Sequence, residues 1–247
     1  LRGIGLQEDG TLATYVDVPL AVLVKAPDSL SWDMLLYTEA VATALSAAHL
    51  PALATAKNIA VVGRGPQHDL TCHIMASELP NSHVVKIDPH SINHHPNRFD
   101  AVVETWADST IVAPMVHALR VGGTLVLKSR PNKMVLLPRQ DIVDRCVHVV
   151  HAPYGSFAKA TTWMSEHVEM LSALGGMDFP FTPEGIALAI EDDPLRAQVG
   201  KLRVVVDPQA VALPLQSTLP TTASSEKERQ EQMYATFAVA GHGVLLG

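Results

Sequence analysis

The fold of this chain is decided by Val61-Val62-Gly63-Arg64-Gly65-Pro66-Gln67-His68, which is typical of a turn from a strand into a helix. In a G-x-G-x-x-G turn, the first glycine makes the tight turn and the second lets the backbone approach a pyrophosphate. The third glycine lets the helix pack closely on the strand. Gly63 and Gly65 take the first two places here, and His68 takes the third. The stretch therefore predicts a dinucleotide-binding frame in which one part is altered.

The next strand supplies a candidate ribose-binding acid. Val84-Val85-Lys86-Ile87 has the composition of a strand, and Asp88 follows it in the place where such an acid is expected. Gly63, Gly65 and Asp88 are thus the candidate cofactor-binding residues. An acid in this place favours NAD over NADP as the ligand.

Two departures favour the alternative that the turn is inherited without its ligand. His68 replaces the third glycine, and only ten residues, Pro89 to Arg98, lead to the next apolar strand at 99–104. A right-handed parallel crossover needs about a dozen or more residues and usually contains a helix. We therefore expect the third β-α unit to be missing and the adenosine side of the sheet to be reduced. In this alternative Asp88 only caps a strand.

Periodicity and turn residues predict the other elements and an α/β class, a Rossmann-like doubly wound parallel sheet. A strand is expected within 10–25, a turn at Pro27-Asp28-Ser29, and a helix over 34–49 that Ser31 or Asp33 caps. The later elements are a strand at 58–62, a helix from Pro66 that stops before Pro80, a helix from Ser109 to Gly122-Gly123, strands at 124–128 and 146–151, a helix over 156–174, and a strand at 202–206.

Composition limits the function classes. The chain has 247 residues, of which 47% are apolar, enough for one domain or for one domain with a small lobe. A formal net charge of -7 argues against a protein that mainly grips nucleic-acid phosphates, so no direct nucleic-acid contact is expected. Two cysteines, Cys72 and Cys146, support neither a disulfide framework nor a cysteine zinc site and suit a reducing compartment. No apolar segment reaches the length of a membrane span.

Several segments together resemble a known family. Gly10 to Pro19, Leu23 to Asp28 and Thr38 to Leu45 are similar to the end of the catalytic lobe and the following helix of medium-chain dehydrogenases/reductases, the zinc alcohol and polyol dehydrogenases. Phe99 to Glu104, Leu119 to Leu127 and Val199 to Val206 are similar to later strands of that family. The resemblance covers most of residues 10–207, and it lies mainly in the order and spacing of these segments.

The resemblance implies a division of the chain into four parts. Residues 1–45 would be a remnant of the GroES-like catalytic lobe, 46–175 a Rossmann-like cofactor-type domain, and 176–207 a return to the catalytic lobe. Residues 208–247 would be a C-terminal extension that packs on the body or docks in a partner. The start at Leu1 rather than methionine suggests a processed chain, a fragment or an incomplete sequence.

The resemblance also bears on metal binding. The family carries most catalytic zinc ligands in roughly its first hundred residues, ahead of the region that this chain matches. Glu39 matches a zinc-site carboxylate of the polyol branch, but no cysteine or histidine stands at the partner positions, and one glutamate cannot make a tetrahedral site. Because the loop holding His90, His94 and His95 lacks groups to orient the imidazoles, we expect it to be solvated rather than metal-binding.

Two further groups are candidates for chemistry or binding. Ser156 and His151 could suggest nucleophilic catalysis, but no third group is identifiable and Ser156 suits a helix cap. No catalytic residue is therefore assigned. Arg64 could meet a phosphate or a carboxylate of a partner.

The leading functional hypothesis is a degenerate dehydrogenase-like protein that serves as a non-catalytic scaffold or accessory subunit. Its partners would be protein subunits of a larger assembly, such as a mitochondrial respiratory complex or ribosome, and no cofactor is required, although NAD binding stays open. The alternative is an NAD(P)-dependent zinc-type alcohol or polyol oxidoreductase whose N-terminal lobe is missing from this chain. A third hypothesis is a methyltransferase-like domain that binds S-adenosylmethionine at the same turn.

Overall fold

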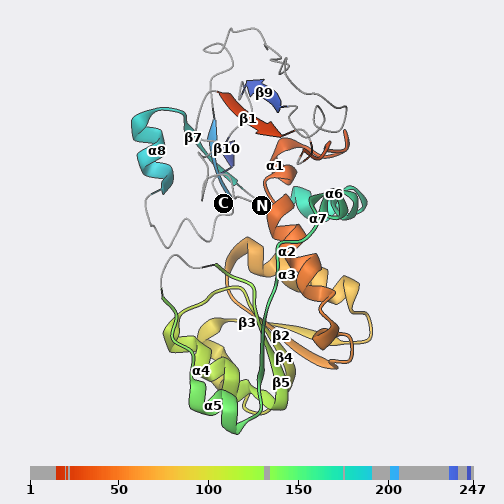
Figure 1. Cartoon of the computed structure of the whole chain (residues 1–247), viewed down its shortest axis with the longest axis vertical. Coiled ribbons are helices and arrows are strands. Elements are labelled where there is room, and N and C mark those ends of the chain that lie inside the picture. Colours follow the sequence, from red (N-terminus) through yellow and green to blue (C-terminus); the bar gives the residue numbers. More distant parts are fainter. Residues whose placement is uncertain are drawn as a thin grey trace, which may run out of the picture. The chain divides into compact units, whose positions relative to one another are not determined.

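The computed structural model describes residues 15–19, 21, 23–130, 134–174, 176–190, 201–205, 234–238 and 244–245. The chain divides into two compact units (Figure 1). The larger unit comprises Pro27–Leu174 with Arg196–Gly200. The smaller unit comprises Leu1–Ala26, Gly175–Leu195 and Lys201–Gly247.

A parallel sheet forms the centre of the larger unit. Among the described residues it has five strands in the order β3-β2-β4-β5-β6, and every neighbouring pair is parallel. The chain passes from β2 outward to β3 and then returns to β4 on the other side of β2, which makes the β2–β4 boundary a switch point in strand order. The bounds are β2 Asn58–Val62, β3 His83–Ile87, β4 Phe99–Glu104, β5 Leu119–Leu127 and β6 His148–His151. The strands predicted at 58–62, 84–87 and 99–104 are confirmed.

Helices cover both faces of this sheet. Alternate residues of each strand point to opposite faces, so Val61, Val103 and Val126 pack with α2 and α3, and Val62, Val102 and Leu125 pack with α4. This two-sided cover confirms the doubly wound α/β class. The helical elements of the unit are α1 Trp32–Leu35, α2 Thr38–Ala48, η2 Pro51–Leu53, α3 Gly65–Glu78, η3 Pro89–His94, α4 Ser109–Ala118, α5 Arg139–Asp144, α6 Phe157–Glu166 and α7 Val168–Ser172.

The connection from β3 to β4 is short, as predicted. It contains only η3, a short 3-10 helix capped by Asp88, whose side chain accepts a hydrogen bond from His90 N. Ile92 of η3 is buried against the face that α4 covers. Within the described residues no strand pairs with the outer side of β3, so the third β-α unit is absent from this sheet.

Three predicted helices differ from the observed ones. The helix predicted over 34–49 is α1 followed by α2, and Ser31 caps the first of them. The helix predicted over 156–174 is divided into α6 and α7, because the helical conformation is interrupted at His167. The ring of His167 stacks on Trp163, and its Nδ1 donates a hydrogen bond to the Trp163 carbonyl at 2.8 Å.

The third difference lies around α4. Asp108 caps this helix instead of Ser109, because the Asp108 carboxylate accepts the Thr110 N–H at 3.0 Å. The helix ends at Ala118 rather than at Gly122-Gly123, and β5 begins directly at Leu119. The strand predicted at 124–128 is therefore longer at its start. Gly122 takes a positive φ of 76° inside β5, which accommodates an irregularity in its pairing with β4.

Among its described residues, the smaller unit contains two sheets. β7 Gly176–Pro180 pairs in parallel with β8 Lys201–Val205, and β10 Val244–Leu245 pairs with the other side of β8. β1 Tyr15–Pro19 pairs antiparallel with β9 Tyr234–Ala238. In the C-terminal segment, for which packing on the body and docking in a partner were the two expectations, the described strands β9 and β10 pair with β1 and β8. The rest of the strand expected within 10–25 lies largely outside the described residues.

Two further features complete the fold. α8 Pro183–Ile190 packs beside β7, with Phe179 and Ala189 buried together. Among the described helices, none has the length and apolar character needed to cross a bilayer.

Candidate nucleotide site at the Gly63–Gly65 turn

A surface depression lies at the carboxyl ends of β2 and β3. Its volume is ≈ 470 Å³, and its walls come from the turn after β2, the first turns of α3 and the end of β3. It brings the three predicted residues Gly63, Gly65 and Asp88 together. The lining residues are Gly63, Arg64, Gly65, His68, Asp69, Lys86 and Asp88.

Both glycines of the turn are required by the local backbone. Gly65 has a φ of 75°, a left-handed conformation that costs side-chain-bearing residues energy. A Cβ on Gly63 would lie 1.8 Å from Oγ1 of Thr105, at the end of β4. The two glycines therefore let the chain make this turn beside β4, and they would do so with or without a ligand.

The turn delivers the N-terminus of α3 to the depression. The first N–H groups of a helix have no partner within the helix, and the side chain of the N-cap residue, Arg64, makes no capping hydrogen bond to α3. Pro66 stands at the start of the helix and has no N–H, so Gly65, Gln67 and His68 carry the N–H groups of this turn. Together with the helix dipole, these groups favour an anion at this end of the depression.

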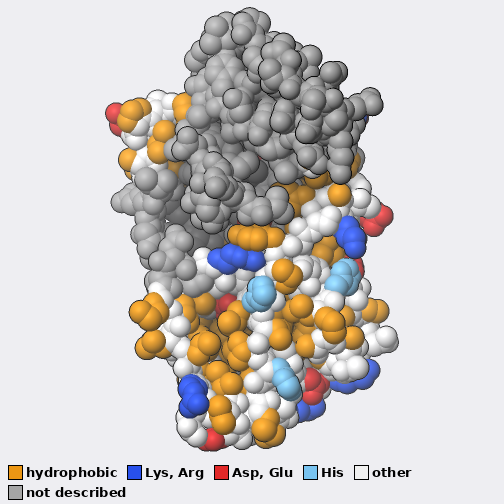
Figure 2. All heavy atoms as spheres, viewed as in Figure 1, with side chains coloured by type: hydrophobic (Ala, Val, Ile, Leu, Met, Phe, Trp, Pro, Cys, Tyr) orange, Lys and Arg blue, Asp and Glu red, His pale blue; other side chains and the backbone are white. Residues whose placement is uncertain are grey.

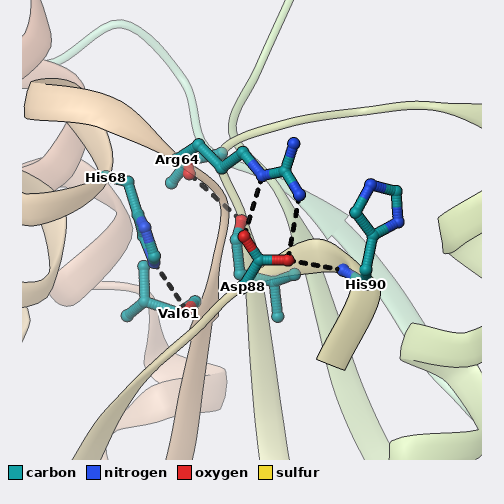
Figure 3. A network of polar contacts seen from close by, with 7 residues as sticks. Val61, Arg64, His68, Asp88 and His90 are labelled. Carbon is teal, nitrogen blue, oxygen red and sulfur yellow. Dashed lines mark hydrogen bonds and ion pairs between the residues drawn. The ribbon is translucent and has the colours of Figure 1, made fainter. Parts of the chain in front are cut away.

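Arg64 bridges the turn and the end of β3. Its Nε donates to Asp88 Oδ2 at 2.8 Å and its Nη2 donates to Asp88 Oδ1 at 3.1 Å (Figure 3). His90 N also donates to Oδ1, at 2.9 Å. The pKa of Asp88 lies below its ordinary value, mainly because Arg64 donates hydrogen bonds to the carboxylate. Arg64 therefore pairs with a carboxylate of its own chain, which neither expectation for this residue named.

A second ion pair lines the side of the depression. Lys86 Nζ contacts Asp69 Oδ1, and both side chains are more than half exposed. With Arg64 and Asp88, the lining thus holds two cations and two anions. Sequence reasoning missed Asp69 and Lys86. The available signal was positional, since Lys86 stands two residues before Asp88 and Asp69 stands on the first turns of the helix that follows the glycines.

His68, in the third glycine place, lies beneath the turn. Only 1% of the residue is exposed, and its Nε2 lies 2.8 Å from the Val61 carbonyl. Because a carbonyl only accepts, Nε2 carries a proton and donates it, while Nδ1 has no partner among the described residues. Burial is the main cause that lowers the pKa of His68. The neutral imidazole of His68 therefore links α3 to β2 by a hydrogen bond, at the position where the fingerprint has a glycine that lets helix and strand pack closely.

This burial gives a pH prediction. The folded pKa of His68 is below the unfolded one, so its contribution to stability is present above the ordinary histidine pKa of about 6.5 and is lost as the pH falls through the folded value. The variant His68→Gln keeps a donor for Val61 and removes the titration. Urea unfolding at pH 7.5, 6 and 5 should show a steeper loss of stability in the wild type than in the variant. Parallel losses would show that His68 is not buried as a neutral ring.

Glu104 is a buried acid that the sequence analysis did not single out. It ends β4, is fully buried, and accepts the Ser129 N–H on Oε2 at 3.3 Å. Burial is the main cause that raises the pKa of Glu104. The sequence shows an acid at the end of the apolar strand Phe99 to Glu104, but the alternation of residues in this strand does not indicate that the acid is buried.

The other candidate residues have structural partners. Ser156 caps α6 by accepting the Lys159 N–H at 3.3 Å, as expected. His95 Nδ1 lies 3.1 Å from the guanidinium of Arg98. Glu39 lies in the first turn of α2 and is half-buried. Across the described parts of the chain, no group of three His, Cys, Asp or Glu residues is arranged to hold a metal ion.

Comparison with solved structures places this architecture among dehydrogenases. L-idonate 5-dehydrogenase of Escherichia coli is 18% identical with a TM-score of 0.54, over 71% of this chain and 58% of that one. A protein of Sinorhizobium meliloti described as a zinc-binding dehydrogenase, bound to NADP, is 19% identical with a TM-score of 0.62, over 81% and 67%. The 2R,3R-butanediol dehydrogenase of Bacillus subtilis is 19% identical with a TM-score of 0.54, over 71% and 58%.

Over the aligned part, the chain has the fold of these dehydrogenases. The resemblance predicted from the sequence is thereby confirmed at the level of fold. No family model matches the sequence, and no curated protein matches it significantly. The aligned part spans 58% of the length of the E. coli enzyme, so the comparison concerns part of such a protein.

Within this dehydrogenase-like fold, the depression borders the position expected of a ligand site. Open parallel sheets bind ligands outside the carboxyl ends of the strands, at the switch point in strand order. Here β2 and β4 meet at that point, and Gly63 directly follows β2 and abuts Thr105 directly after β4.

Proposed function

We propose that this chain binds a nicotinamide dinucleotide at the Gly63–Gly65 turn, as the cofactor-binding part of an NAD(P)-dependent oxidoreductase. The single observation that carries the proposal is the depression at the carboxyl ends of β2 and β3, whose lining includes the first residues of α3. The solved structures support it at the level of fold, and one of them is bound to NADP. The alignment covers only part of each of those proteins, so an oxidoreductase activity of the whole protein is also only proposed.

The residues present fit the phosphate part of such a ligand. Gly65 has no side chain to block a phosphate that approaches the backbone of the turn. The N–H groups of Gly65, Gln67 and His68 lie in the first turn of α3, the end of a helix that favours an anion. His68 does not obstruct this approach, because it is buried toward Val61. The altered third position of the fingerprint is thus compatible with binding.

The ribose part fits with one rearrangement. Asp88 stands where the ribose-binding acid is expected, but Arg64 already donates two hydrogen bonds to it. The side chains of Arg64 and Asp88 are 36% and 46% exposed, and solvent weakens ion pairs at such exposure. Ribose hydroxyls can therefore displace part of this pair. When bound, the nicotinamide would accept or donate a hydride, and the residues above would hold the phosphates and the ribose.

A second candidate is the non-catalytic scaffold or accessory subunit of a larger, mitochondrial assembly. Two observations favour it. Arg64 already binds Asp88, the carboxylate expected to bind the ribose, and the larger unit has exposed hydrophobic side chains. Met134 is 84%, Leu136 65% and Tyr154 58% exposed. Figure 2 shows hydrophobic side chains spread over the visible face of this unit. Such a surface suits protein partners.

Calorimetry on the purified native protein separates these functions. NAD+, NADH, NADP+ and NADPH are titrated one by one, S-adenosylmethionine tests the methyltransferase hypothesis, and co-purifying chains are identified. Saturable binding of a dinucleotide in the micromolar range supports the proposal. Absence of dinucleotide binding, together with stoichiometric partner chains, would support the scaffold instead. Binding of S-adenosylmethionine alone would contradict both.

A further inference from the structure

The Arg64–Asp88 pair bears on whether the acid at the end of β3 selects NAD over NADP. An acid in this place accepts the ribose hydroxyls of NAD, and an arginine nearby accommodates the 2′-phosphate of NADP. In this chain both groups are present, and the arginine comes from the glycine-rich turn itself. The usual rule for the acid alone therefore does not describe this site.

The negative charge of the Asp88 carboxylate is balanced by Arg64, and both of its oxygens already accept hydrogen bonds. Oδ1 accepts hydrogen bonds from Arg64 and from His90 N, and Oδ2 accepts one from Arg64. An unpaired carboxylate would repel a phosphate that arrives beside it, whereas a carboxylate paired with a guanidinium presents little net charge. Lys86 and Asp69 form a second pair on the same wall, so the wall as a whole has no excess negative charge.

Arg64 retains hydrogen-bonding capacity after it has bound Asp88. A guanidinium has five N–H donors, and the pair with Asp88 uses Nε and Nη2. The other terminal nitrogen points away from the carboxylate in Figure 3. A fork of this kind matches phosphate geometry, and the partly exposed side chain can turn toward an arriving anion.

We propose that Arg64 is a specificity-determining residue that lets this site accept NADP as well as NAD. The proposal rests on the proposed function, since it concerns the ligand of the same depression. Ribose hydroxyls can still reach Asp88 Oδ2, which accepts a single hydrogen bond from the described residues, so NAD is retained. The 2′-phosphate is admitted because Arg64 cancels the charge of Asp88 and offers its remaining donors.

Two substitutions should change the preference in opposite directions. Arg64→Met keeps an apolar stem and leaves Asp88 uncompensated, so affinity for NADP+ relative to NAD+ should fall about tenfold. Asp88→Asn leaves Arg64 without its anionic partner, so the same ratio should rise about tenfold. Arg139→Met is the matched control, because Arg139 is an exposed arginine of α5 outside the depression.

The experiment is calorimetric titration of the full chain and its three variants with NAD+ and NADP+ at low and moderate salt. The wild type should bind both within about tenfold of each other, and Arg139→Met should not change the ratio. Thermal unfolding confirms that the variants are folded, and 2′,5′-ADP against 5′-AMP repeats the comparison on the adenosine half alone.

The outcomes distinguish this inference from the proposed function. A wild type that prefers NAD+ more than a hundredfold, with a ratio that Arg64→Met leaves unchanged, overturns the role of Arg64 while dinucleotide binding stands. A wild type that binds neither nucleotide overturns the proposed function, and this inference with it.

Discussion

Replacing Gly65 by alanine is expected to weaken dinucleotide binding at least about tenfold, because the turn can no longer hold its left-handed geometry without strain. The φ of Gly65 is 75°, and this residue is the first of α3. A shift of the turn tilts the N–H groups of the first helical turn away from the phosphates that we place there. The measurement is calorimetric titration of the wild type and the variant with NAD+ and, separately, with NADP+.

Gly122→Ala is the matched control for this prediction. Gly122 has nearly the same φ, 76°, and no atom lies within 4 Å of a Cβ built on it. Both variants should lose about 1 to 2 kcal/mol of unfolding free energy from the left-handed alanine. Only Gly65→Ala should lose binding. If the two variants bind equally well, the phosphate site is not at the Gly63–Gly65 turn.

Gly63→Ala is expected to destabilise the chain by about 1 to 3 kcal/mol, the range for forcing extra atoms into a well-packed position. The new methyl group would lie 1.8 Å from Thr105 Oγ1, so either the turn or the end of β4 must move. Thr105 also donates its hydroxyl to the Val62 carbonyl at 3.1 Å, which fixes the rotamer that causes the overlap. Urea unfolding of the wild type and variant measures the loss.

A double-mutant cycle with Thr105→Ala tests the cause of this loss. Removing the hydroxyl takes away the closest atom and leaves the Thr105 Cβ at 3.2 Å from the new methyl group. The double variant should therefore be clearly more stable than the sum of the two single losses predicts. Strict additivity would mean that the contact between Gly63 and Thr105 does not explain the requirement for glycine.

The strands and the helix around the turn were predictable because several local signals agree. Apolar residues fill 59–62, Pro66 suits a first helical turn, and Pro80 follows the end of α3. Element ends were less predictable where two residues compete. Asp108 and Ser109 both suit an N-cap, and only the observed bond to Thr110 N decides between them. The break at His167 depends on its stacking with Trp163, a contact that periodicity does not show.

The site was predictable in position and less so in its contacts. The spacing of Gly63, Gly65 and Asp88 along two neighbouring strands was enough to place them at one edge of a parallel sheet. The partner of Arg64 was not determined by spacing, because a long side chain on a turn can reach several groups. The burial of His68 depends on packing between α3 and β2, which no sequence pattern specifies.

The most direct test of the central claim is a 1H–15N spectrum of the isotopically labelled chain during separate titrations with NAD+ and NADP+. The predicted result is a saturable shift of the amide signals of residues 63–68 and 86–88, with the signals of β6 unchanged. The same titration of Gly65→Ala should show those shifts only at much higher ligand concentration. A spectrum that does not change with ligand, or that changes only at residues far from the turn, would contradict the account.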